Sequence, residues 1–351
     1  MKSNKATGPD MIPAEQFKAS EPAVTELHQV LQTIWREEDI PQDFVLADMM
    51  LLYKKKCRNN RANYRCLGLL NHSNKIFAMV LLMRIMPFIT PKLSDTQAGF
   101  RKRRGCRDNV FILVTTIQHL LQSAETEAQS RGIITYIDFT AAFDSILHSY
   151  LFNALKQYGV PPKYCRLVQC VYKSAKARVR LQEPGGNRSH SRSIEIRRGV
   201  IQGDIPSPIC FLVALDKLLK DHGSLHQGVK LTDLLHLSDL EYADDAAFPD
   251  ESAELATNRL TILDAKAKDE AGMEISIPKT KAQHICKRPK VTCTTEDDIV
   301  NLPPEKQFKY KCEKCDMTYP TQQGLNVHKG RWCKKRKTKR KPVSKERLPI
   351  E

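Results

Sequence analysis

The chain has 351 residues, of which 41% are hydrophobic and 27% are charged, as is ordinary for a soluble globular protein. Its formal net charge of +16 favours a polyanionic partner, most simply nucleic acid. The N-terminal stretch MKSNKATGPDMIPAEQ has no apolar segment, which excludes a signal peptide. The apolar run FAMVLLM stops at Arg84, short of the roughly 20 residues that a membrane helix needs. We therefore expect a soluble, intracellular protein with no membrane partner.

Hydrophobic periodicity and turn residues predict the elements in chain order. The first half is expected to contain a helix over 22–36, a strand from residue 47 into a lysine cluster, an apolar helix ending at Pro87, and a helix over roughly 108–130. The second half is expected to contain a strand at 132–139, a helix closed by Gly159, a hairpin around Gly185 and Gly186, an apolar helix over 206–223, and two short strands within LEYADDAAF. A polar linker is expected to begin near residue 286.

Three aspartates lie in apolar surroundings. Asp138 lies between Ile137 and Phe139 in a predicted strand, and Asp244 and Asp245 are adjacent in LEYADDAAF. Neighbouring strand residues face opposite sides of a sheet, so the adjacent pair can converge only at a hairpin turn. Buried carboxylates need a counter-charge, and a shared Mg²⁺ is an economical one; two such ions form the clamp for phosphoryl transfer. The alternative is an exposed Asx turn.

Seven short motifs occur in a fixed order. TYIDFTAAFDS, RRGVIQGDIPSP and YADDAAF together resemble the A, B and C motifs of reverse transcriptases, specifically those of non-LTR (LINE-like) retrotransposons. Upstream, KATGPDMIPAE, NYRCLGLLN and QAGFRKRRGCRDN resemble the finger segments of that family, and GMEISIPKTKAQHI downstream is similar to its D motif. The resemblance spans roughly residues 3 to 285.

The resemblance implies catalytic roles for the three aspartates. Asp138 and Asp244 would be the principal Mg²⁺ ligands, with Asp245 in a lesser role, and Ile137 and Phe139 would fix the first of them in the palm sheet. For Asp144, a recurring acid of motif A, metal binding competes with a role as the N-cap of the helix that follows.

The resemblance also implies a set of nucleotide-binding residues. Phe143 would crowd the sugar 2′ carbon, and Gln202 and Gly203 would lie against the nucleotide and template. Arg65 would grip the triphosphate together with one of Lys54, Lys55 or Lys56. Lys279 would protonate the leaving pyrophosphate, the alternative being a solvated surface lysine.

The sequence departs from the family pattern at several positions. Cys66 replaces a usual proline, Gly68 a usual serine, and Ser276 a common asparagine. The sequence also shows no recognisable primer-grip motif and no helical thumb. We therefore expect the acids to be preserved in a truncated polymerase.

A cysteine and histidine cluster follows the motifs. Cys312 and Cys315 are followed by His328 and Cys333, with Tyr310, Tyr319 and Leu325 at the core positions of a ββα finger. Three sulfur ligands and one imidazole suit tetrahedral Zn²⁺. The segment resembles a C2H2-type zinc finger in which Cys333 replaces the last histidine. After it, seven of the eight residues from 334 to 341 are Lys or Arg, which indicates a nuclear localisation signal, a nucleic-acid arm or a solvated tail.

The predicted fold is therefore an α+β right-hand polymerase with an antiparallel palm sheet, plus a small ββα zinc finger. Fingers and connecting helices would occupy residues 1–132, and a palm with motifs A, B, C and D residues 133–285. A linker would follow at 286–308, the zinc finger at 309–333, and a basic disordered tail at 334–351.

The predicted function is that of a retrotransposon RNA-directed DNA polymerase that uses two Mg²⁺ ions. Its expected partners are an RNA template, a DNA primer and deoxynucleoside triphosphates, and its expected location is the nucleus after passage through the cytoplasm. The alternative is a catalytically inactive retroelement remnant that binds nucleic acid through its zinc finger.

Overall fold

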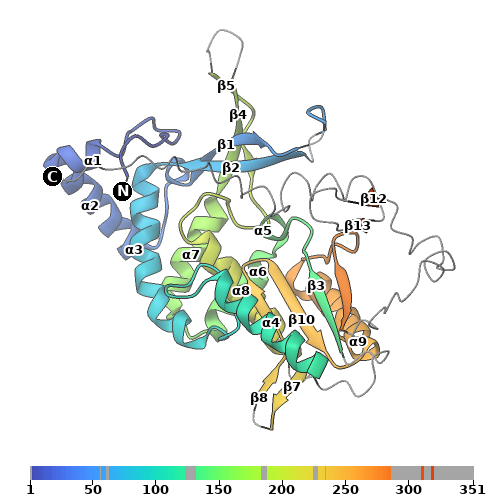
Figure 1. Cartoon of the computed structure of the whole chain (residues 1–351). Helices are drawn as coiled ribbons and strands as arrows, with labels where there is room; N and C mark the ends of the chain where they lie inside the picture. Colours follow the sequence, from blue (N-terminus) through green and yellow to red (C-terminus); the bar gives the residue numbers. More distant parts are fainter. Residues whose placement is uncertain are drawn as a thin grey trace, which may run out of the picture. The chain divides into compact units, whose positions relative to one another are not determined.

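The chain divides into two units, Met1–Arg288 and Pro289–Glu351. The computed structural model describes residues 2–55, 57–60, 63–122, 132–182, 188–223, 228–233 and 235–285, together with 310–311 and 318–319. In the second unit, β12 (Tyr310–Lys311) and β13 (Thr318–Tyr319) form an antiparallel pair. The first unit carries the motif residues and is described below (Figure 1).

The sheet that carries the acidic motifs is built around a strand rich in β-branched residues. This strand, β3 (Gly132–Ile137), is almost wholly buried. It lies between β11 (Lys281–Ile285) and β10 (Asp245–Asp250), and β9 (Leu240–Tyr242) pairs with the other edge of β10. Every pairing in this β3 sheet is antiparallel, which confirms the predicted antiparallel sheet.

A second sheet is formed by segments that lie before and after strand β3 in sequence. β1 (Leu46–Tyr53) pairs antiparallel with β2 (Tyr64–Leu70) and parallel with β4 (Lys176–Gln182). β4 continues into the predicted hairpin by pairing with β5 (Arg188–His190), and also pairs with β6 (Ile194–Glu195). Figure 1 shows the β4–β5 end of this β1 sheet projecting beyond β1 and β2.

A buried helix runs through the centre of the first unit. This helix, α8 (Ser207–Gly223), is apolar on all sides in its first half, where residues 211–215 are 0% exposed, and carries charged residues in its second half. α6 (His148–Gln157) and α7 (Pro162–Ser174) contribute to the same core, as does α9 (Ala253–Lys266). Gly159 follows α6 with φ +72°, a conformation that favours glycine, so the predicted closure of this helix is confirmed.

The two predicted N-terminal helices form, with a difference at the end of the second, and a short helix that was not predicted precedes them. α1 (Gln16–Ala19) leads into α2 (Glu21–Glu37), whose N-cap Ser20 accepts a hydrogen bond from Ala23 N. α3 (His72–Ile89) was expected to end at Pro87 but continues to Ile89. A proline removes one hydrogen bond, and the buried side chain of Ile89 keeps the last turn packed against the core.

The expectation that the apolar run is too short for a membrane span is wrong. In the described part of the chain, His72–Lys92 is long and apolar enough by length and composition. The helix passes Arg84, whose guanidinium lies 4.1 Å from the centre of the Trp35 ring. One side of the helix is nevertheless buried in the protein core through Phe77, Leu81, Ile85 and Ile89, while Met83 on another side is 70% exposed. We therefore assign α3 to the core.

The helix predictions around the acidic motifs need two corrections. α4 (Cys106–Gln122) begins two residues earlier than predicted, and its expected end at 130 lies outside the described residues. Asp144 lies inside the short α5 (Ala142–Ser145), and Leu147 occupies the N-cap of α6 without a side-chain cap. The N-cap interpretation of Asp144 is therefore wrong, because the extended backbone at Ile146 separates the two helices.

A buried ion pair joins α9 to the β3 sheet. Arg259 Nη2 lies 2.9 Å from Asp250 Oδ1, with side-chain exposures of 7% and 2%. Burial raises the pKa of Asp250, and the charge of Arg259 opposes that shift. Removing one member of such a pair strands the other charge in the core, which costs far more than the intact pair contributes.

We predict that Arg259→Met destabilises the full chain by about 3 kcal/mol, because it leaves the Asp250 carboxylate without a counter-charge. Urea-induced unfolding measures this loss. Lys230→Met is the matched control, since it breaks an ion pair with Asp233 whose side chains are 51% and 94% exposed. The control should cost less than about 1 kcal/mol. Equal losses in the two variants would contradict the prediction.

Candidate active site

The strand register brings two of the three aspartates together. In the β3–β10 pair, Ile137 is opposite Ala246. Asp138 directly follows β3, and extending the register by one residue sets it across from Asp245. Directly opposed residues of an antiparallel pair share a face, so both carboxylates are directed to the same side of the sheet. The buried neighbours Ile137 and Phe139, each 3% exposed, hold this end of β3 in place, as predicted.

The third aspartate lies in the turn between β9 and β10. Asp245 is opposite Tyr242, so Ala243 and Asp244 form a two-residue hairpin turn. The predicted pair of short strands joined by a turn is confirmed, but only Asp244 lies in the turn, because Asp245 is the first residue of β10. We name Ala243, Asp244 and Asp245 the acidic turn. Ala243 has φ +58°, a left-handed conformation that is uncommon for a residue with a side chain.

The charges of the other two aspartates act on Asp245. The pKa of Asp245 is raised by partial burial first, and then by the negative charges of Asp244 and Asp138. The positive charge of Lys279 lowers it in part. Charge repulsion of this kind is strongest when the groups face one space, and an added cation would relieve it.

Lys279 supplies a counter-charge that the sequence analysis did not foresee. Its Nζ donates a hydrogen bond to Asp138 Oδ1 at 2.7 Å. The position follows from the backbone, because Ser276 N donates to Asp138 O at 2.7 Å and Ser276 O accepts from Lys279 N at 3.0 Å. The turn of motif D is therefore attached to the end of β3. Ser276 makes these contacts through its main chain.

The acids suit Mg²⁺ in their chemistry but are not assembled as a metal-binding group. Among the described residues, no three Asp, Glu, His or Cys side chains are grouped so as to hold an ion. The prediction that metal ions hold the acids in place is thus not confirmed, since Lys279 holds Asp138. Carboxylate oxygens are nevertheless the ligands that Mg²⁺ prefers. The mutual repulsion at Asp245 also fits a site for a cation.

A second polar group joins three segments of the chain. Gln202 Nε2 donates to Asp144 Oδ1 at 3.4 Å, a long hydrogen bond between motif B and motif A. Burial raises the pKa of Asp144, while this bond and the charge of Lys54 act to lower it. Lys54 therefore lies near motif A although it comes from the end of the β1–β2 hairpin. Sequence analysis proposed Lys54 and Gln202 for nucleotide binding but missed Asp144 as their shared neighbour.

Phe143 has a fixed position beside these groups. Its ring stacks on that of Phe211 in α8, with centroids 4.3 Å apart and an angle of 17° between the planes. Phe211 is fully buried, so the half-exposed ring of Phe143 rests on the core. A ring supported in this way can act as a rigid wall.

The motif B loop meets the β1 sheet through two glycines. Gly68 N donates to Gln202 O at 2.7 Å, and a Cβ at Gly203 would lie 2.5 Å from Gly68 O. Gly203 also has φ +112°, which other residues rarely adopt. The glycine at position 68, where the family commonly has serine, therefore matches a close backbone approach.

The remaining predicted residues lie in less constrained positions. Arg65 is exposed in β2, opposite Leu52, and strand alternation places it on the other face from Gly68. Lys55 is exposed beyond the end of β1, and Lys56 lies outside the described residues. The predicted zinc ligands also lie outside the described residues; they are Cys312, Cys315, His328 and Cys333.

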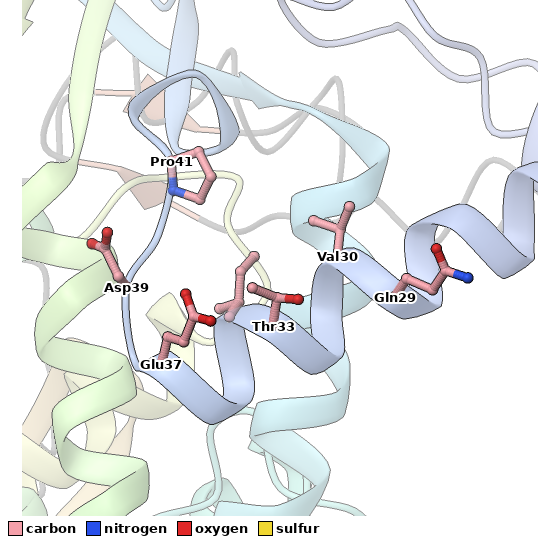
Figure 2. A pocket seen from close by; sticks show the side chains of 7 residues that line it. Gln29, Val30, Thr33, Glu37, Asp39 and Pro41 are labelled. Atoms are coloured by element: carbon pink, nitrogen blue, oxygen red, sulfur yellow. The ribbon is translucent and has the colours of Figure 1, made fainter.

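A pocket elsewhere in the first unit is separate from these residues. It has a volume of about 550 Å³ and lies beside α2, where Figure 2 shows Glu37 and Asp39 at one end and Gln29 at the other. Its lining residues are Gln29, Val30, Thr33, Ile34, Glu37, Asp39 and Pro41. None of them is a predicted site residue, so the acidic turn remains the best candidate for chemistry.

Comparison with known proteins gives matches over most of the chain. A family model described as "Reverse transcriptase (RNA-dependent DNA polymerase)" matches residues 53–318. The "Transposon TX1 uncharacterized 149 kDa protein" of Xenopus laevis is 27% identical over 220 residues, which cover 62% of this chain and 16% of that protein. The "Retrovirus-related Pol polyprotein from type-2 retrotransposable element R2DM" of Drosophila melanogaster is 29% identical over 226 residues, covering 61% and 20%.

Solved structures with a similar arrangement include an apo telomerase from Candida tropicalis truncated from its C-terminal domain. The TM-score is 0.47 at 11% identity, and the match covers 74% of this chain and 55% of that one. The chain spans about a fifth or less of the curated relatives named above, 16% and 20% of their length. The family match extends over residues 53–318, well over half of the sequence. The chain therefore belongs to the reverse transcriptase (RNA-dependent DNA polymerase) family.

Proposed function

We propose that the chain is the fingers and palm part of a non-LTR retrotransposon reverse transcriptase that synthesises DNA on an RNA template. The main support is the strand register that sets Asp138 across from Asp245 beside the acidic turn. The β3 sheet would be the palm, and the β1 sheet would belong to the fingers. The family match and the relatives from retrotransposable elements support the same assignment.

The proposed reaction is nucleotidyl transfer. The 3′-oxygen of a primer would attack the α-phosphate of a deoxynucleoside triphosphate, forming a P–O bond while the bond to pyrophosphate breaks. Bound Mg²⁺ would supply charge stabilisation and activate the attacking oxygen. Asp138, Asp244 and Asp245 would hold it, and their carboxylates therefore have to be ionised. Lys279 would leave Asp138 as the metal enters and donate a proton towards the departing pyrophosphate.

The other proposed roles concern the nucleotide. Phe143 would form the wall beside the sugar, and Gln202 with Gly203 would line the base and template side. Lys54, Lys55 and Arg65 would approach the triphosphate from the fingers. The 2.7 Å hydrogen bond between Gly68 N and Gln202 O supports this arrangement, because it joins the proposed fingers to motif B. Arg65 would have to reach the triphosphate by a movement of the exposed hairpin.

The second unit would bind nucleic acid. We propose Zn²⁺ at Cys312, Cys315, His328 and Cys333, supported by their spacing and by the β12–β13 pair, which brackets the two first cysteines. The basic tail at 334–351 would contact phosphates and direct the protein to the nucleus.

We predict that Asp244→Ala lowers DNA synthesis on poly(rA) primed with oligo(dT) by at least about 100-fold, because it removes a carboxylate that binds the metal. Primer extension by the full chain measures this. Asp233→Ala, at an exposed acid in the hairpin of β7 (Val229–Thr232) and β8 (Leu235–Leu237), is the control and should retain wild-type activity. Background synthesis by the wild type together with retained nucleic-acid binding would instead favour an inactive retroelement remnant.

We predict that Phe143→Ala weakens discrimination against ribonucleotides by roughly 10- to 100-fold, because it removes the wall beside the sugar. The ratio of kcat/KM for dTTP to that for UTP measures the effect. Phe143→Tyr keeps the ring and should keep the discrimination. Unchanged discrimination in the alanine variant would show that the stacked ring lies away from the sugar.

We predict that Lys279→Met lowers kcat by roughly 100-fold while lowering the Mg²⁺ concentration needed for half-maximal activity. The first effect follows from loss of the proton donor, and the second from loss of the cation that competes for Asp138. Lys281→Met, at an exposed position of β11, is the control. A lower Mg²⁺ requirement with unchanged kcat would show that Lys279 is only the counter-charge of Asp138 and not a proton donor.

A further inference from the structure

A segment far from the acidic motifs in sequence lies directly against them. Residues 94–101 precede α4, and their backbone pairs with β9: Ala98 N donates to Glu241 O at 2.9 Å, and Glu241 N donates to Thr96 O at 3.2 Å. Gln97 forms an isolated parallel bridge with Glu241. The segment therefore supports the strand that leads into the acidic turn.

The side chain of Gln97 uses both ends of its amide at this junction. It is 0% exposed. Its Oε1 accepts hydrogen bonds from Gly99 N at 2.8 Å and from Ala243 N at 3.1 Å. Its Nε2 donates to Glu241 Oε2 at 2.7 Å. A buried amide with all these partners satisfied fixes the backbone around it, whereas removal of the amide would leave buried polar groups without partners.

The hydrogen bond that Gln97 accepts from the acidic turn is donated by the strained residue of that turn. Ala243 has φ +58° and directly precedes Asp244. Its left-handed conformation costs energy, so surrounding contacts have to maintain it. Gly99 makes room for this close approach, because a Cβ there would lie 2.3 Å from Ala243 N.

Asn109 of α4 strengthens the same junction. Its Nδ2 donates to Thr96 O at 2.9 Å and to Glu241 O at 2.7 Å. One side chain thus joins residues 94–101 to β9. Burial strongly raises the pKa of Glu241, and the nearby charges of Asp239 and Asp216 act in the same direction. The amide of Gln97 opposes that shift by its hydrogen bond.

We propose that Gln97 is a positioning residue for the acidic turn: its amide holds Ala243 in the left-handed conformation and thereby sets the carboxylates of Asp244 and Asp245. The proposal rests on the proposed polymerase function only for its effect on catalysis. Its effect on the geometry of the turn and on divalent-ion binding is independent of that function. Asn109 assists by clamping the strand before the turn.

The test compares Gln97→Met with Asn74→Leu in the full chain. Methionine keeps the length of Gln97 but removes its hydrogen bonds. Asn74 is a matched control, because it is also a buried amide, 3% exposed, whose Nδ2 donates to Phe44 O at 2.8 Å away from the acidic turn. Three properties are measured: amide exchange of residues 240–246, Mn²⁺ affinity by electron paramagnetic resonance, and kcat with KM for dTTP.

We expect Gln97→Met to speed exchange at Ala243, to weaken Mn²⁺ binding roughly 10-fold, and to lower kcat roughly 10- to 100-fold with little change in KM. Asn74→Leu should change stability alone. Equal exchange and equal Mn²⁺ affinity in the two variants would overturn the proposal. If Gln97→Met does not fold, Asn109→Ala, at a half-buried site, must produce the same changes in weaker form.

The readouts separate this proposal from the proposed function. A wild-type chain that makes no DNA would count against the polymerase assignment. Exchange and Mn²⁺ affinity would still decide the role of Gln97, since neither needs turnover. Faster exchange at Ala243 with unchanged Mn²⁺ affinity would contradict the link between the turn and the carboxylates.

Discussion

The antiparallel register between β3 and β10 is the constraint on which the site depends. Ile137 opposite Ala246 sets Asp138 across from Asp245, and a shift of one residue would turn one of the two carboxylates to the other face. The register is maintained by burial on both sides of the pair, because β3 and most of β10 are buried in the protein. Apolar packing of the two strands therefore aligns the carboxylates of the candidate active site.

The acids are kept near one another at an electrostatic cost. Repulsion from Asp244 and Asp138 adds to burial in raising the pKa of Asp245. Lys279 offsets part of this cost through its 2.7 Å hydrogen bond to Asp138. Divalent ions would offset it more completely. The raised pKa of Asp245 and the partial counter-charge of Lys279 therefore fit the cation site that the proposed function requires.

Local patterns in the sequence were sufficient for the strands and helices that build the core. The β-branched run in β3, the apolar α8 and the hairpin of LEYADDAAF all formed as expected. Local patterns failed where the outcome depended on neighbours. Asp144 does not cap α6, because the backbone at Ile146 breaks the helix before it. Pro87 does not end α3, since Ile89 is held in the core.

Contacts between residues far apart in the chain could not be predicted from local sequence patterns. The resemblance of motifs marked Lys279 and QAGFR. It could not show that Lys279 binds Asp138, 141 residues away, or that Gln97 binds Ala243, 146 residues away. Such pairs arise only when separate strands and loops are packed. The four predicted zinc ligands are a different case, because their spacing predicts a zinc site but the residues lie outside the described part of the chain.

The most direct measurement is an anomalous difference map from crystals of the full chain grown with Mn²⁺ in place of Mg²⁺. The account predicts a peak about 2.1 Å from carboxylate oxygens of Asp138 and of the acidic turn, with the Lys279 ammonium displaced from Asp138. A map with Lys279 still bound to Asp138 and no peak between these carboxylates would contradict it.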